Sequence, residues 1–296
     1  MNTRQLEYFM VAAECSNVTE AAERLHMAQP PLSRALKNLE EELGVTLFSR
    51  SNRGVRLTDA GRLLYDEAKP LFRQIENIQT VVRESSNGLC GCIKIGACYS
   101  TLPIVTQKMS IFLEQHPACT FSMLHGTISE LESWLRDGTI DVLFLRNCIV
   151  ESADFVHVTL PDDPLCLVIH QSLDACPTES TVDISYLKGL PLCLLDETRF
   201  PKPNSELFGA CKKQGFSPRI ICTCYDNSAG LALALNAIAA TFLPVSSVTM
   251  NRYDELHVKT IRYVDLTSCP TMIYNPGIYH TKSVDAFLSM FSAHSD

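Results

Sequence analysis

The stretch that decides the fold is Thr19–Thr58, which reads TEAAERLHMAQPPLSRALKNLEEELGVTLFSRSNRGVRLT. Residues 19–26 predict a short helix, and residues 27–28 leave room only for a tight turn. A second helix is predicted from Gln29 to Leu43, because its leucines recur at spacings of four, three and four and Gly44 follows as a terminator. Two helices joined by so short a turn indicate a helix-turn-helix.

The face of the second helix opposite its leucines is polar and basic. A hairpin with its turn near Asn52–Gly54 is predicted after it and would form a basic wing. Residues 29–39 and 50–56 hold five basic residues and no acidic one, although the whole chain has a net charge of −8. The acidic balance argues against a protein that coats nucleic acid along its whole surface, but a sequence-specific binder needs only a local basic face. The candidate DNA contacts are Gln29, Pro30, Pro31, Ser33, Arg34, Lys37, Arg50 and Arg53.

These residues resemble the winged helix-turn-helix of LysR-type transcriptional regulators. The matching motifs within Leu6–Gly61 are LEYFMVAAE, AAERLHMAQPPLSR, LEEELGVTLFSR and RGVRLTDAG. Asn17–Val18 and Pro31 depart from the commonest family pattern without threatening the fold. The resemblance implies the same DNA-contacting positions, a double-stranded DNA operator, a homodimer or homotetramer, and RNA polymerase as a further candidate partner.

Helices are also predicted on either side of this motif. Residues 5–14 form an amphipathic helix that would complete a three-helix core, and Thr58 can cap a long helix. That long helix carries an apolar stripe at spacings of four and three, formed by Leu64, Ala68, Leu71, Ile75, Ile78 and Val82. Pro70 should bend it. We expect the stripe to form a dimer seam; the alternative is packing against the effector domain of its own chain.

From Cys90 onward, predicted strands and helices alternate, which indicates a parallel-rich α/β sheet with helices on both faces. This half resembles the effector-binding domain of the same family, which is similar to type II periplasmic binding proteins. The resemblance implies two α/β subdomains joined by two crossovers, near Leu160–Pro161 and Asp265–Leu266, with a ligand cleft between them. The predicted parts are a winged domain (1–58), a linker and dimerisation helix (59–87), and an effector-binding domain (88–296) divided into subdomain I (90–160 and 266–296) and subdomain II (161–265).

Ligands of such sheets bind at the carboxyl ends of strands, beside helix N-termini that favour anions. Four loops qualify, at residues 99–101, 126–127, 199–204 and 226–228. We therefore expect a small anionic effector such as a carboxylate, with Arg146 as a candidate counter-charge. The alternatives are that each hydroxyl merely caps a helix and that Arg146 is a surface residue. The candidate effector contacts are Ser100, Thr101, Thr127, Arg146, Arg199, Phe200, Asn204 and Asn227.

Other functions receive little support from the sequence. No catalytic motif, metal-ligand spacing or cofactor fingerprint is present, so we expect neither an enzyme nor a bound cofactor. The chain has 13 cysteines and no recognisable export signal, which predicts reduced thiols and a cytoplasmic protein. The uncharged stretch Asn227–Asn251 reads as a buried helix and strand rather than a membrane span. A thiol-based redox sensor built on the same fold is the alternative function.

Overall fold

The computed structural model describes residues 1–51, 54–146, 153–196, 201–249, 253–264 and 266–292. The chain forms two compact units, residues 1–79 with 137–139, and residues 80–136 with 140–296. Each has its own hydrophobic core. Within the described part, no helix is both long enough and apolar enough to cross a membrane.

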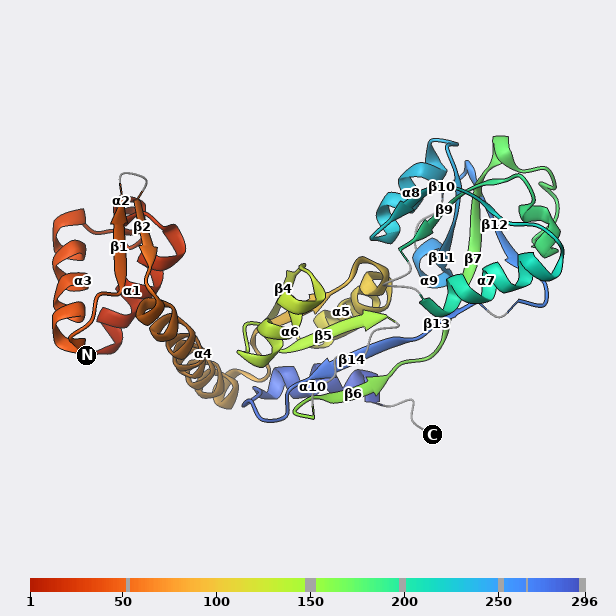
Figure 1. The fold of residues 1–296 in the computed structure, drawn as a ribbon. Coiled ribbons are helices and arrows are strands. Elements are labelled where there is room, and N and C mark those ends of the chain that lie inside the picture. Colours follow the sequence, from red (N-terminus) through yellow and green to blue (C-terminus); the bar gives the residue numbers. More distant parts are fainter. Residues whose placement is uncertain (52–53, 147–152, 197–200, 250–252, 265, 293–296) are drawn as a thin grey trace. The chain divides into compact units, whose positions relative to one another are not determined.

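The first unit begins with a three-helix core and a β-hairpin (Figure 1). The α3 helix begins and ends at the predicted residues, and Gly44 follows it in a left-handed conformation with φ of 68°. The α2 helix begins one position before the predicted Thr19, because the Asn17 side chain accepts a hydrogen bond from the Thr19 N–H at 2.9 Å and caps it. The elements are α1 (Thr3–Cys15), α2 (Val18–Arg24), α3 (Gln29–Leu43), β1 (Phe48–Ser51) and β2 (Gly54–Leu57).

The backbone of the wing is held against the helices by the Glu40 carboxylate and by a close approach to Ser16. Glu40 of α3 accepts hydrogen bonds from the N–H groups of Leu47 (2.7 Å) and Phe48 (3.0 Å), which fixes the start of β1. At the start of β2, Gly54 has φ of 116°, and a Cβ there would lie 2.5 Å from the Ser16 carbonyl oxygen. Only glycine fits this close approach, so Gly54 of the predicted turn has a steric reason.

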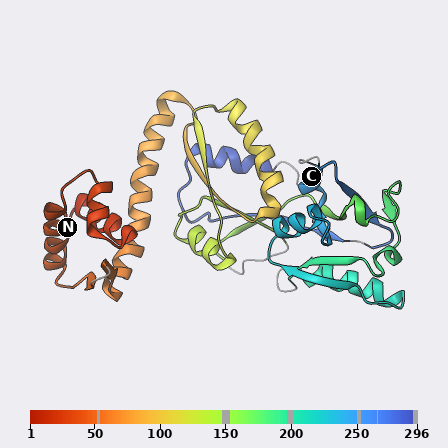
Figure 2. The ribbon, with the colours of Figure 1, turned by 90° about the horizontal axis from the view of Figure 1, so that it is seen from above.

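The α4 helix spans Asp59–Asn87 without interruption at Pro70 and is the long orange helix of Figure 2. The Thr58 hydroxyl accepts from the Gly61 N–H at 3.0 Å, so Thr58 caps the helix as predicted. Ala68 of the predicted stripe is buried, whereas Leu71, Ile78 and Val82 are 44%, 55% and 64% exposed. A single copy of the chain therefore leaves much of the apolar stripe uncovered.

The second unit contains two mixed sheets (Figure 1). The first has the order β4-β3-β5-β14-β6. Its strands are β3 (Gly91–Ala97), β4 (Cys119–Leu124), β5 (Val142–Arg146), β6 (Val156–Thr159) and β14 (Pro270–Tyr274), and its helices are η1 (Tyr99–Thr101), α5 (Leu102–Gln115), α6 (Ile128–Arg136) and α10 (Lys282–Ser292). Helices cover both faces, because Val142 and Phe144 of β5 join one core with α5 and α10, and Leu143 and Leu145 join another with α6.

The second sheet has the order β10-β9-β11-β7-β12-β8, with β13 paired to β7. Its strands are β7 (Asp163–His170), β8 (Thr181–Val182), β9 (Pro191–Leu195), β10 (Arg219–Cys224), β11 (Ala240–Pro244), β12 (Leu256–Ile261) and β13 (Thr267–Ser268). Its helices are η2 (Gln171–Leu173), η3 (Ile184–Leu187), α7 (Pro201–Lys213), α8 (Asn227–Leu235) and α9 (Val245–Thr249). The elements β8, β13 and α9 were not predicted, because each is too short to show a periodic pattern.

The prediction of parallel-rich sheets needs correction. The strands β7 and β14, which follow the two crossings between sheets, pair antiparallel with their neighbours. A parallel neighbour needs a long crossover connection, and the direct crossings between the sheets supply none. The first crossing lies between β6 and β7, at residues 160–162. The second comes after Ser268, later than the predicted Asp265–Leu266, because β13 still pairs with β7; Asp265 itself lies outside the described residues.

Candidate functional sites

The α3 helix presents a polar surface opposite its buried leucines. Leu32, Leu36 and Leu39 are at most 3% exposed and anchor the helix in the core of the first unit. The predicted DNA contacts Gln29, Pro30, Pro31, Arg34 and Lys37 are exposed, and Ser33 is partly exposed. The spacing of the leucines therefore fixes which side of α3 faces outward.

Some side chains on this face already contact other residues of the protein. The Gln29 amide donates to the Ser33 hydroxyl at 2.9 Å, and Lys37 lies 3.3 Å from Glu41 on the next turn. Among the described residues, Arg34 has no ion pair, so its guanidinium is available to an external acceptor. Arg50 lies in β1 opposite Val55, but its side chain and the whole of Arg53 are outside the described residues.

A pocket of about 240 Å³ lies between the two sheets of the second unit, where the first turns of α5 and α8 face one another. Because α5 belongs to the first sheet and α8 to the second, the pocket is bordered by both subdomains. Its lining consists of Tyr99, Leu102, Pro103, Thr106, Asn227, Ser228, Leu231, Leu243 and Ser247.

Two polar groups in this pocket are buried and unpartnered. Asn227 is 8% exposed, and neither its amide nitrogen nor its amide oxygen makes a hydrogen bond. The Ser247 hydroxyl is also buried without a partner. Buried polar groups are nearly always hydrogen-bonded, so unpaired groups that line a cavity mark a place for a ligand or water.

The predicted hydroxyls of Ser100, Thr101 and Thr127 are engaged within the protein. The Thr101 hydroxyl donates to the Cys98 carbonyl oxygen at 2.8 Å, and the buried Ser100 hydroxyl lies 3.2 Å from the Cys98 sulfur. Thr127 is exposed, and its hydroxyl donates to the Glu130 carboxylate at 2.8 Å. The Thr127 N–H donates to the same carboxylate, and the two residues form a capping box at the start of α6.

Two further candidates are also used inside the fold. Arg146 is buried, and its guanidinium bonds to the Asp163 carboxylate at 2.6 Å and to the Ser100 carbonyl oxygen at 2.8 Å. It therefore does not offer the free counter-charge that was expected. The Asn204 amide donates to the Leu195 carbonyl oxygen at 2.8 Å and lies in a separate small pocket. Arg199 and Phe200 lie outside the described residues.

Sequence reasoning placed Asn227 and the loops that begin at Tyr99 and Asp226 near a ligand, and the pocket includes residues of both loops. It missed Ser247 and the apolar lining. The sequence did contain a signal for Ser247. Ser246–Ser247 follow the end of β11 in the same way that the other loops follow their strands. The short helix α9 that carries Ser247 lies within Asn227–Asn251, which was interpreted only as a buried helix and a strand.

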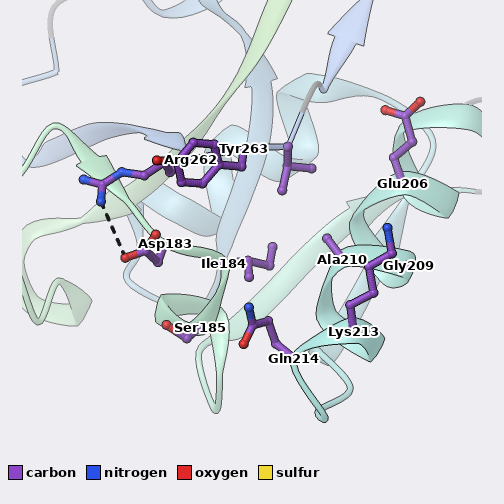
Figure 3. A pocket seen from close by; sticks show the side chains of 11 residues that line it. Asp183, Ile184, Ser185, Glu206, Gly209, Ala210, Lys213, Gln214, Arg262 and Tyr263 are labelled. Carbon is purple, nitrogen blue, oxygen red and sulfur yellow. Dashed lines mark ion pairs between the residues drawn. The ribbon is translucent and has the colours of Figure 1, made fainter.

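A larger pocket of about 680 Å³ lies elsewhere on the second subdomain (Figure 3). One wall is the face of α7 that carries Glu206, Gly209 and Lys213, and the opposite wall holds Asp183, which pairs with Arg262 at 3.8 Å. This ion pair is largely exposed, and the lining belongs to one subdomain only. The pocket between the sheets is therefore the better candidate for a ligand that acts on both subdomains.

The fold defines a class of protein: a winged helix-turn-helix followed by an α/β domain of two subdomains with a pocket between them. Models of protein families identify that class. Residues 3–62 match the bacterial regulatory helix-turn-helix protein of the lysR family, and residues 86–296 match the LysR substrate binding domain. The chain belongs to the LysR family of transcriptional regulators.

Individual relatives agree over most of the chain. It is 28% identical to the transcriptional regulator BsdA of Bacillus subtilis (strain 168), over 98% of this chain and 100% of BsdA. It is 32% identical to TcbR of Pseudomonas sp. (strain P51), over 83% of each chain. The crystal structure of full-length CbnR complexed with its target DNA superposes with a TM-score of 0.76 at 26% identity, covering 99% of both chains.

Proposed function

We propose that α3 reads the operator and that the pocket between the sheets binds the effector that controls this regulator. The unpartnered amide of Asn227, buried in a pocket that both subdomains line, is the single observation that carries the effector site. The family membership supports the pairing of these two activities in one chain.

In the proposed DNA complex, α3 enters the major groove with its exposed face toward the bases. Arg34 reads a guanine through paired hydrogen bonds, while Lys37 and Ser33 contact phosphates or base edges. Gln29 is placed to recognise an adenine, and Pro30 and Pro31 make apolar contacts. Arg50 and Arg53 of the wing bind phosphates or the minor groove. Exposure of Gln29, Arg34 and Lys37 on one helix face supports this arrangement.

The chain acts as a dimer through α4, and the dimers pair into a tetramer through their effector-binding domains. The exposed apolar residues Leu71, Ile78 and Val82 support a seam on α4. Two winged domains would then meet two half-sites related by two-fold symmetry. CbnR has been crystallised in complex with its target DNA, and we extend DNA-bound assembly to this chain.

Effector binding works by changing how the two subdomains are held. A ligand shifts an equilibrium between two states only through its different affinity for each. A molecule that touches α5 on one side and α8 with Ser247 on the other makes more contacts when the subdomains approach each other. The resulting rearrangement of paired effector domains would change the spacing of the wings on DNA. We place this activity in the cytoplasm and assign the protein binding functions only, with no catalytic step.

Selection of bound DNA from a random library by the purified full chain tests the first half of the proposal. We expect enrichment of two half-sites separated by one or more helical turns, about 10 base pairs each. If the recovered DNA shows no enriched sequence, the proposal that α3 reads bases is contradicted. A thermal-shift screen of small metabolites tests the second half, since a ligand at 100 times its dissociation constant stabilises the protein by about 2.7 kcal/mol. Asn227→Leu should remove that stabilisation and leave DNA selection intact.

The alternative of thiol-based control is supported by one observation. The sulfur atoms of Cys193 and Cys224 lie 3.5 Å apart on the neighbouring strands β9 and β10. Both side chains are buried, which limits access by an oxidant. Ligand control by the pocket therefore remains the main proposal.

A further inference from the structure

The pocket between the two sheets carries a specific chemistry, and this inference rests on the effector site proposed above. We propose that the effector of this chain is a compact, largely apolar and uncharged molecule that carries both a hydrogen-bond donor and an acceptor. We infer the charge of the effector from the hydrogen-bonding groups and the charges of the residues that line the pocket.

The unpartnered polar groups of the pocket can both donate and accept hydrogen bonds. The Asn227 amide has an unpaired nitrogen, which donates, and an unpaired oxygen, which accepts. The Ser247 hydroxyl can do either. A ligand group that complements a primary amide, such as another amide, satisfies both atoms of Asn227 at once. A carboxylate accepts only, so it would leave the Asn227 oxygen unpaired.

The rest of the lining is apolar and uncharged. Leu102, Pro103, Leu231 and Leu243 supply aliphatic surface, and none of the described lining residues carries a charge. Tyr99 at the edge of the pocket stacks on His125, with ring planes 3° apart and centroids at 4.9 Å. Surfaces of this kind favour a flat or compact hydrocarbon body.

The features that would attract an anion are already occupied by the protein's own carboxylates. At the start of α8, the Asp226 carboxylate accepts from the N–H groups of Ser228 (2.8 Å) and Ala229 (3.0 Å). At the start of α6, the Glu130 carboxylate accepts from the Thr127 N–H at 2.8 Å, and hydrogen bonds from the backbone and hydroxyl of Thr127 lower the Glu130 pKa. The positive ends of these helices are thus already neutralised, and Asp226 would repel an incoming carboxylate.

Among the described residues, the start of α5 and the nearby arginine offer an anion less than the sequence suggested. Pro103 lies in the first turn of α5 and has no N–H to donate. Arg146 is held by Asp163 at 2.6 Å and contributes no net charge to its surroundings. The expectation of a carboxylate effector, drawn from helix N-termini in the sequence, is therefore replaced by that of a neutral one.

The size of the pocket limits the ligand to about one ring. A volume of about 240 Å³ lies below the range of roughly 300–1,000 Å³ that is typical for drug-sized ligands. A six-membered ring with one amide fits the apolar walls and places its polar group beside Asn227. Benzamide has this form, and benzoate has the same shape and heavy-atom count with a negative charge.

Isothermal titration of the full chain with benzamide and with benzoate tests the proposal. We expect benzamide to bind in the low millimolar range, as suits a ligand of about nine heavy atoms, and at least about tenfold more tightly than benzoate. Asn227→Leu and Ser247→Ala should each weaken benzamide binding, by about tenfold for Asn227→Leu. Ser185→Ala, in the larger pocket of Figure 3, is the matched control and should change nothing.

The outcomes separate the ligand class from the site. Benzoate binding as tightly as benzamide, with loss in Asn227→Leu, would overturn the neutral class and leave the cleft as the effector site. Benzamide binding that is unchanged in both Asn227→Leu and Ser247→Ala would overturn the pocket itself. Absence of benzamide binding to the folded wild-type chain would overturn the proposed ligand class. A preference for benzamide that disappears in the pocket variants and survives in Ser185→Ala supports it.

Discussion

The guanidinium of Arg146 lies 2.6 Å from the carboxylate of Asp163, and the two side chains are 1% and 8% exposed. Arg146 is the last residue of β5 in one sheet, and Asp163 is the first residue of β7 in the other. Ser246 of α9 joins the same group, since its N–H donates to Asp163 at 3.1 Å. The ion pair therefore links the two subdomains beside the pocket.

Arg146→Met should destabilise the protein strongly, because it leaves the Asp163 carboxylate buried without its counter-charge. The expected loss is about 3–5 kcal/mol in the free energy of unfolding, measured by urea denaturation. The double variant Arg146→Met with Asp163→Leu should lose less, since an apolar pair avoids an unpaired charge. Arg136→Gln removes the surface pairs of Arg136 with Glu132 and Asp154 and should change stability by at most about 1 kcal/mol. Equal losses in the single and double variants would show that lost packing explains the effect.

Arg34→Ala should weaken binding to the selected operator by about 1–3 kcal/mol per half-site, while binding to random DNA changes little. The reason is that Arg34 is exposed on α3 and has no internal ion pair among the described residues. Fluorescence anisotropy on operator and random duplexes measures both affinities. Lys188→Ala removes one exposed positive charge from the effector half and is the control. Equal losses on both DNAs would assign Arg34 to phosphate contact.

Arg53→Ala should lower the affinity for operator and random DNA alike. A wing arginine that contacts phosphate contributes a counterion-release term rather than base discrimination. The slope of the logarithm of the binding constant against the logarithm of salt concentration should fall by about one for each lost contact. If the preference for operator over random DNA changes while the slope of the salt dependence does not, Arg53 contacts a base edge.

Replacing Leu71 and Ile78 together with lysine should prevent dimer formation. Both side chains lie on the exposed apolar stripe of α4, at 44% and 55% exposure, and burying two charges in a seam is unfavourable. Light scattering should then report a smaller mass or aggregates. Lysines at Gln74 and Gln79, exposed polar positions of the same helix, are the matched control. An unchanged mass in the Leu71 and Ile78 variant would place the dimer contact elsewhere.

Local patterns predicted the elements better than the partners of polar groups. The leucine spacing and Gly44 gave both ends of α3. Asn227, one of the candidates that the strand ends indicated, lines the pocket between the sheets. The same reasoning failed for Arg146, whose charge is neutralised by Asp163 on another sheet. Such pairing depends on tertiary distances that no sequence period contains. The pairing of Thr127 with Glu130 is different, because it is a local capping box whose T-x-x-E pattern is visible in the sequence.

Acid should destabilise a buried cluster around Asp174 in the second sheet. Burial acts to raise the Asp174 pKa, but hydrogen bonds from Lys259, Tyr186, the Cys176 N–H and His257 outweigh it and hold the pKa below its usual range. A carboxyl group with a lowered folded pKa contributes stability above its unfolded pKa of about 3.9, and this is lost as the pH falls through the folded pKa.

Asp174→Asn therefore should lose about 3–5 kcal/mol at pH 7, because Lys259, 2.9 Å away and 1% exposed, keeps a buried charge. The difference in unfolding free energy between the wild type and this variant, measured by urea denaturation, should persist at pH 5 and become smaller below about pH 4. The control is Asp183→Asn, whose carboxylate is 61% exposed. If the difference in unfolding free energy between the wild type and Asp174→Asn stays constant down to the pH at which the protein unfolds, protonation of Asp174 is not coupled to unfolding.

The reactivity of the cysteines distinguishes thiol control from ligand control. Burial raises the pKa of Cys119 to about 11 and that of Cys166 to about 12, so both thiols stay protonated and unreactive near neutral pH. Among the described cysteines, Cys92 is exposed on β3 and should react first with iodoacetamide, while Cys119 and Cys166 should react only after unfolding. Under mild peroxide, a redox sensor would form one specific disulfide, with two thiols losing two hydrogens and the peroxide reduced to water. We expect mass spectrometry to show scattered oxidation of exposed thiols instead. A single reversible disulfide between Cys193 and Cys224, formed quantitatively in the folded chain, would favour thiol control.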